Sequence, residues 1–120
     1  MLDHISIGVT DLEASKAFYL AALAPLAVAL IHDGPGSVGM GQRGFPSFWL
    51  AAATTTPAPL HLAFTAGTRD QVDACYRAAL AAGARDNGPP GLRAHYHPNY
   101  YGAFVIGPDG HNVEVVCHGA

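Results

Sequence analysis

Two stretches of the chain align with each other: HISIGVTDLEASKAFYLAALA at residues 4–24 and HLAFTAGTRDQVDACYRAALA at residues 61–81. A shift of 57 positions superposes them and gives seven identities, including His4 with His61 and Tyr19 with Tyr76. A constant shift of this kind is typical of an internal repeat of one structural unit. The sequence therefore predicts two similar halves.

Both stretches change from the period of a strand to the period of a helix. Residues 4–9 and 61–66 alternate as half-buried strands do, and apolar side chains at helical spacing follow in each stretch. A threonine precedes each helix and Glu or Gln stands three residues later, which is the pattern of a capping box. These boxes are Thr10 with Glu13 and Thr68 with Gln71. The predicted helices span residues 11–23 and 69–82.

Segments of period two after each helix predict three further strands in each half. They are expected near residues 27–31, 38–42 and 47–52, and near residues 92–97, 103–106 and 112–117. This order gives an α+β fold built from two β-α-β-β-β modules. We expect a single domain over residues 1–120, divided into module one at residues 1–53, a linker at residues 54–59 and module two at residues 60–118.

The composition excludes several classes of partner. Nine acidic and six basic residues give a net charge of −3, so we do not expect the protein to bind nucleic acid. The longest apolar run is interrupted by Pro25 and is too short for a membrane-spanning helix. Because residues 1–4 are not followed by a basic and then an apolar segment, we expect no secretory signal. Cys75 and Cys117 form no CxxC pair. They are predicted to be reduced thiols in a cytoplasmic protein.

The first predicted strand of each half has small residues on one face. Alternate side chains of a strand share a face, so His4 lies beside Ser6 and His61 lies beside Ala63. Side chains this small cannot fill a core. Each histidine is therefore predicted to line a cavity.

Glu114 is the one carboxylate in the predicted strand Asn112–Cys117. Burying it without a partner would be costly unless it found a cation or changed its pKa. Two neutral imidazoles and one carboxylate are a common ligand set for a reactive divalent metal. His4, His61 and Glu114 are therefore candidate metal ligands, and the alternative is that each is an ordinary hydrogen-bonded strand residue.

These features together resemble the vicinal oxygen chelate superfamily, which includes glyoxalase I, fosfomycin-resistance proteins, extradiol dioxygenases and metal-free bleomycin-resistance proteins. The resemblance rests on the paired modules, the histidine on the first strand of each, and a Pro-Asp-Gly turn before Asn112-Val113-Glu114-Val115. It covers nearly the whole chain. It implies that the two modules form a cupped, mixed β-sheet around a small-molecule site.

The resemblance also implies roles for individual residues. His4, His61 and Glu114 match three ligand positions for a divalent ion, which we expect to be Fe, Mn, Ni or Zn. Glyoxalase I has a fourth ligand, an acid, on the last strand of the first module, but residues 47–51 hold none, and Trp49 is expected to wall the pocket. Ser6 corresponds to a substrate-binding hydroxyl of fosfomycin-resistance proteins.

No residue can be assigned as the catalytic acid or base. Extradiol dioxygenases carry a tyrosine where this chain has Phe104, so ring cleavage would need Tyr100 or Tyr101 to reach in from a loop. The segment 93–102 is rich in imidazoles and phenols, and His97 and Tyr101 are candidate substrate-binding residues at a pocket rim. The alternatives are a purely structural turn and, less in keeping with Pro98, the HxH metal motif of a cupin.

Two functions follow from this pattern. The first is a metal-dependent lyase, isomerase, transferase or dioxygenase that chelates adjacent oxygens of a small substrate. The second is a metal-free protein of the bleomycin-resistance type that sequesters a ligand beside Trp49. In either case we expect a homodimer, because the superfamily often completes its cup with a partner and the chain is poor in charge.

We expect three other histidines to lie on the surface: His32, His111 and His118.

Overall fold

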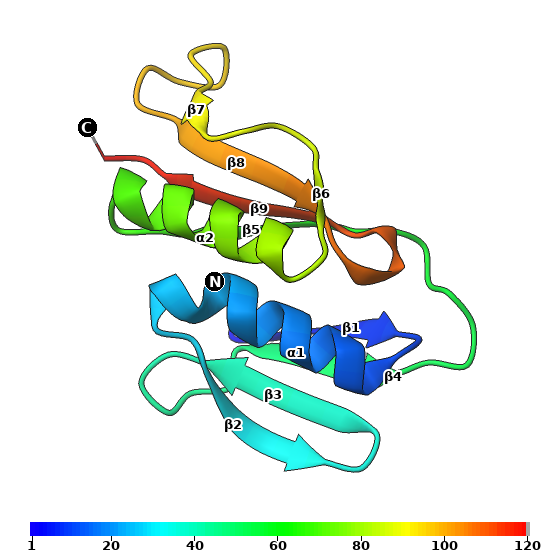
Figure 1. Ribbon diagram of the computed structural model, residues 1–120. Coiled ribbons are helices and arrows are strands. Elements are labelled where there is room, and N and C mark those ends of the chain that lie inside the picture. Colours follow the sequence, from blue (N-terminus) through cyan, green and yellow to red (C-terminus); the bar gives the residue numbers. More distant parts are fainter. Residues whose placement is uncertain (120) are drawn as a thin grey trace.

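One helix covers one face of each of two sheets in the computed structural model, which describes residues 1–119 (Figure 1). The elements of the first half are β1 (Ile5–Val9), α1 (Leu12–Leu23), the 3-10 turn η1 (Ala24–Leu26), β2 (Ala29–Gly34), β3 (Ser37–Gly41) and β4 (Phe48–Ala52). Their sheet has the order β1-β4-β3-β2. Strand β1 runs parallel to β4, and the other neighbours are antiparallel.

The second half repeats this arrangement, with two very short strands directly after its helix. Its elements are β5 (His61–Thr65), α2 (Arg69–Ala81), β6 (Arg85–Asp86), β7 (Gly91–Leu92), β8 (Tyr101–Ile106), the 3-10 turn η2 (Pro108–Gly110) and β9 (Asn112–Cys117). The order is β5-β9-β8-β6, with β7 also on β8 and β5 parallel to β9. The predicted α+β class, with one helix and one mixed sheet in each half, is confirmed, and two short strands take the place of the first strand that was expected after the second helix.

Side-chain caps explain where both helices begin. Helix α2 has the predicted capping box, in which Gln71 N–H donates to the Thr68 hydroxyl and Thr68 N–H donates to Gln71 Oε1. The box predicted at Thr10 is wrong, because Asp11 is the N-cap of α1 and accepts a backbone N–H of the first turn. The Thr10 hydroxyl instead donates to Asp109 in η2 at 2.6 Å.

The strand predicted near residues 92–97 is wrong. Only Gly91–Leu92 pair with β8 there, and residues 93–100 form a loop that the Arg93 N–H closes by donating to the Tyr100 carbonyl at 2.7 Å. Pro98 has no N–H to give to a sheet ladder, which favours this interruption. The loop brings Tyr100 to the start of β8.

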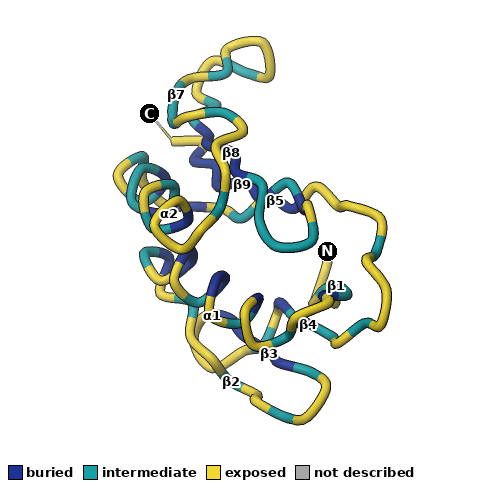
Figure 2. The backbone as a smooth tube through the Cα atoms, turned by 45° about the vertical axis from the view of Figure 1, so that its right-hand side comes forward, coloured by how far each residue is buried: buried dark blue, intermediate teal, exposed yellow. Residues whose placement is uncertain are grey.

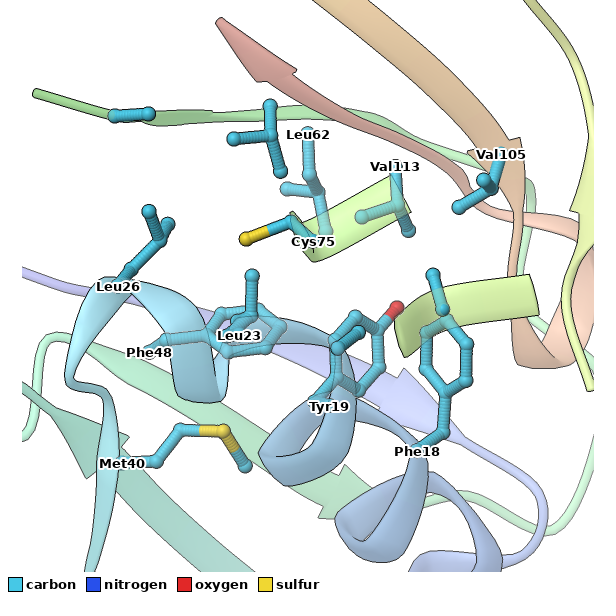
Figure 3. Close-up of a cluster of buried hydrophobic side chains, with 14 of the residues drawn as sticks. Phe18, Tyr19, Leu23, Leu26, Met40, Phe48, Leu62, Cys75, Val105 and Val113 are labelled. Carbon is cyan, nitrogen blue, oxygen red and sulfur yellow. The ribbon is translucent and has the colours of Figure 1, made fainter. Parts of the chain in front are cut away.

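Both halves contribute to one hydrophobic core (Figure 3). The Tyr19 ring of α1 meets Phe48 of β4 at 4.9 Å between centroids, and Phe48 meets Phe64 of β5 at 5.2 Å. Helices α1 and α2 lie side by side in Figure 1, and Figure 2 shows exposed residues along the connection from β4 to β5. Because each sheet gives one face to this core, its other face is turned outward.

His111, predicted to lie on the surface, is fully buried, and that prediction is wrong. Its Nδ1 accepts a hydrogen bond from the Leu60 N–H at 3.0 Å, and its Nε2 lies 3.4 Å from the Gly8 carbonyl. Since Nδ1 accepts, the neutral ring carries its proton on Nε2 and donates it toward Gly8. The imidazole therefore joins β1 to the segment that enters β5.

Two further findings concern the part of the chain that the structure describes. None of its helices is long and apolar enough to cross a lipid bilayer. Cys75 and Cys117 are both buried and free of disulfide bonds.

Candidate metal site on the outward sheet faces

Two partners hold the carboxylate of Glu114 on the outward face of the second sheet. Nε2 of His61, on the neighbouring strand β5, lies 2.7 Å from Oε1. The phenol of Tyr100 donates a hydrogen bond to Oε2. The parallel register pairs Ala63 with Glu114, so His61, two residues earlier on β5, presents its ring on the same face.

A glycine makes room for the Tyr100 ring. A Cβ atom at Gly102 would lie 3.2 Å from a ring carbon of Tyr100 and 3.4 Å from Glu114 Oε2. Burial of the phenol and its hydrogen bond to Glu114 raise the pKa of Tyr100 to about 12. Tyr100 is therefore a hydrogen-bond donor to the carboxylate at neutral pH.

The carboxylate of Glu114 has no fixed cation beside it. Only 2% of its side chain is exposed, and among residues 1–119 its single ion-pair partner within 4 Å is the His61 imidazole. That imidazole, whose side chain is 55% exposed, balances the charge only when it is protonated. A divalent cation between the two side chains would balance the charge in its place, so the donor set fits a metal.

His4 lies just before β1, at the outward face of the first sheet. Its Nδ1 is 2.7 Å from Asp3 Oδ1, and its side chain is 59% exposed. It shares an open hollow of about 350 Å³ with Ser6 and Trp49. The Trp49 indole is oriented by its N–H, which donates to the Pro46 carbonyl at 2.8 Å.

The strand registers show that Trp49 is the counterpart of Glu114. Ser6 of β1 pairs with Trp49 of β4, and Ala63 of β5 pairs with Glu114 of β9. Because the 57-residue shift superposes Ser6 on Ala63, an indole stands in the first half where the second half has a carboxylate. Of the three candidate ligands, the first half therefore holds only His4.

Two of the three candidate ligands are brought together within one chain. His61 lines a hollow of about 440 Å³ that is separate from the one lined by His4. Among residues 1–119, no three His, Cys, Asp or Glu side chains gather into a metal-binding group. One chain thus presents His61 with Glu114 on one sheet and His4 on the other.

The two remaining predicted site residues lie away from this pair. His97 Nε2 is 2.6 Å from His118 Nδ1, in a stacked pair of imidazoles near the Tyr100 ring. Tyr101 faces α2, where its phenol donates to Asp73 at 2.7 Å. Tyr101 contacts Asp73 of α2, whereas its neighbour Tyr100 contacts Glu114, because successive residues of an extended chain point to opposite faces of the sheet.

Sequence reasoning missed two residues beside His61 and Glu114. Sequence pattern offers Tyr100 only as an alternative to Tyr101. The parity of Tyr100 with Phe104, which pairs with Glu114 across β8 and β9, indicates the correct face. Arg93, which lines the hollow of His61, lay in a segment predicted to be a strand. No local signal places its side chain there, since the loop around it depends on pairing with β8.

The chain belongs to the Glyoxalase/Bleomycin resistance protein/Dioxygenase superfamily. The family model of that name matches residues 1–115. The recognition made from the paired modules and the strand histidines is thus confirmed. No curated protein gives a significant match to the chain.

Several solved structures share this fold. A glyoxalase/bleomycin resistance protein from Albidiferax ferrireducens T118 is 28% identical, with 95% of each chain covered and a TM-score of 0.80. A putative glyoxalase from Bacillus halodurans is 26% identical, with 98% of this chain and 95% of that chain covered and a TM-score of 0.70. A mutant of the fosfomycin-resistance protein FosX from Listeria monocytogenes, in complex with Mn(II) and 1S,2S-dihydroxypropylphosphonic acid, is 18% identical. There the coverage is 97% of this chain and 88% of that chain with a TM-score of 0.72, so the likeness is one of fold alone.

Proposed function

We propose that the protein is a metal-dependent enzyme that holds a divalent ion, Fe, Mn, Ni or Zn, through His4, His61 and Glu114. The observation that carries the proposal is the buried Glu114 carboxylate, which has His61 beside it and no lysine or arginine among residues 1–119 to neutralise it. When bound, such an ion polarises adjacent oxygens of a small substrate. Lyase, isomerase, transferase and dioxygenase reactions all use that chemistry.

The site is completed in a homodimer. His4 lines a different hollow from His61, so the three ligands meet only when the first sheet of one copy faces the second sheet of another. A two-fold axis would form this contact twice. Exposed aromatic side chains support the pairing, because Phe45 is 49% exposed beside His4 and Tyr96 is 58% exposed beside His61.

Tyr100 acts as a positioning residue for the ligand set. Its phenol donates to Glu114 Oε2 and leaves Oε1 facing His61. A carboxylate fixed in this way offers one oxygen to an ion beside the imidazole. Ser6 and Trp49 line the hollow of His4, which supports a role for them in contacting the substrate.

Mixing two inactive variants tests the shared site. In a two-fold dimer, a His4→Ala chain paired with a Glu114→Gln chain retains one site with all three ligands and one site that lacks both altered ligands. Each homodimer alone should bind Mn²⁺ or Zn²⁺ weakly, and the mixture should regain tight sites. If the mixture binds no better than the separate variants, the ligands do not come from two chains.

Metal-free sequestration of a small ligand is the second candidate function. It is favoured by the hollow in which Trp49 replaces the carboxylate, because its other walls include Phe45 and Pro46. An aromatic ligand would stack on such an indole. Quenching of Trp49 fluorescence by an aromatic ligand, at the same affinity with and without EDTA, would support this function over the metal-dependent one.

We also propose a cytoplasmic location. The two cysteines are buried and remain free, as is usual for proteins in a reducing compartment. Detection of a Cys75–Cys117 disulfide in protein isolated from its native cells would contradict this.

A further inference from the structure

Among residues 1–119, Arg93 is the only arginine or lysine that lines the hollow beside His61, and the imidazole of His95 lines it as well. The hollow is also lined by Phe104, Tyr96, Asn87 and Asn112. The guanidinium lies over the Phe104 ring, with 5.4 Å between its central carbon and the ring centroid. Arg93 is therefore stacked on an aromatic surface rather than extended into solvent.

The charge of Arg93 is not neutralised by the protein. Its two terminal nitrogens donate to the Gly91 and Pro89 carbonyls at 2.9 Å and 2.8 Å. These carbonyls orient the guanidinium but carry no net charge. Among residues 1–119, no carboxylate lies within 4 Å of it, although the chain has more acidic than basic residues.

We infer that this hollow binds the carboxylate of an aromatic or other planar organic acid, with Arg93 as the anion-binding residue. An oriented guanidinium with unused N–H groups matches the paired oxygens of a carboxylate. The hollow opens onto His61, so the rest of the acid lies toward the metal ligands. The inference deepens the proposed function and rests on it for the neighbouring ion.

The aromatic side chains favour a planar acid. Phe104 lies under the guanidinium, and Tyr96 lines the same hollow with most of its surface exposed. The amide of Asn87 donates to the Asn112 side-chain oxygen at 3.2 Å, which leaves the Asn112 amide group to donate to a ligand. The hollow thus offers a positive charge on Arg93, and the rings of Phe104 and Tyr96 provide flat apolar surface around it.

Salicylate tests the inference because it combines a carboxylate, an adjacent oxygen and a planar ring. Salicylamide has nearly the same shape without the charge. In metal-free wild-type protein with EDTA at low ionic strength, ¹⁵N chemical-shift titration should show salicylate binding at least about tenfold tighter than salicylamide. The largest shifts should fall on residues 87–93 and on Phe104.

Two arginine variants complete the experiment. Arg93→Gln should weaken salicylate binding at least about tenfold, whereas Arg77→Gln, on the exposed face of α2, should leave it unchanged. Equal binding by Arg93→Gln, equal binding of salicylamide, or shifts located elsewhere would overturn the inference. If Arg93→Gln does not fold, the wild-type comparison of the two ligands and the shift map still decide it.

The metal-free design separates this inference from the proposed function. Loss of salicylate binding with intact metal binding would refute only the role of Arg93. Intact salicylate binding in a protein that binds no divalent ion would refute only the metal site.

Discussion

Tyr100 lies in the loop before β8 and Glu114 lies on β9, yet the phenol of Tyr100 donates a hydrogen bond to Oε2 of the buried Glu114 carboxylate. The contact depends on the loop at residues 93–100 and on the missing side chain at Gly102. It leaves one carboxylate oxygen facing His61. The loop that sequence periodicity failed to predict thus holds Tyr100, the positioning residue of the proposed site.

Replacing Tyr100 with Phe removes the donor and keeps the ring. A buried carboxylate oxygen without its donor costs about 1–3 kcal/mol, so the free energy of unfolding should fall by that amount at pH 7 in EDTA. The affinity for a divalent ion should also change severalfold, because the carboxylate is no longer fixed.

Tyr101→Phe is the matched control for that experiment. It removes a phenol from the adjacent residue, whose hydrogen bond to Asp73 lies on the other face of the sheet. It should leave metal affinity unchanged. Equal effects of the two variants on metal binding would show that Tyr100 does not position the Glu114 carboxylate for the ion.

His111→Ala should be strongly destabilising. It leaves the Leu60 N–H without its acceptor and opens a cavity at a fully buried position. We expect a loss of about 2 kcal/mol or more in urea unfolding, whereas His95→Ala, on the exposed loop, should change stability by less than about 0.5 kcal/mol. A loss as small as that of His95→Ala would mean that the imidazole does not join the two halves.

Cys75 should be unreactive until high pH. Burial raises the pKa of its thiol to about 11. Because the folded pKa is the higher one, neutral burial stabilises the fold below about pH 8.5, and this contribution is lost as the pH rises toward 11.

Alkylation rates measure this directly. In a Cys117→Ser variant, iodoacetamide should modify Cys75 slowly at pH 8 and much faster after unfolding in urea. Modification at the rate of an exposed thiol in the folded protein would contradict the burial of Cys75.

Local signals predicted the fold well, and contacts between distant segments account for what they missed. The helices and the strand at Asn112–Cys117 follow from periodicity and caps, and the Thr68 box forms as expected. Thr10 and His111 depart from prediction because each contacts the opposite half of the chain, Thr10 through Asp109 and His111 through the Gly8 carbonyl. The pairing of His61 with Glu114 was predictable from strand parity, whereas the position of Arg93 depends on a loop fixed by β8.

The metal site is tested most directly by calorimetric titration of Mn²⁺ and Zn²⁺ into chelator-treated protein. Wild type should bind at least one of these ions with a dissociation constant below about 1 mM, and Glu114→Gln should bind at least about tenfold more weakly. Glu13→Gln is the matched control, since Glu13 is exposed on α1 and its variant should bind as wild type does. If wild type binds no divalent ion more tightly than about 1 mM, or if Glu114→Gln binds as well as wild type, Glu114 is not a metal ligand.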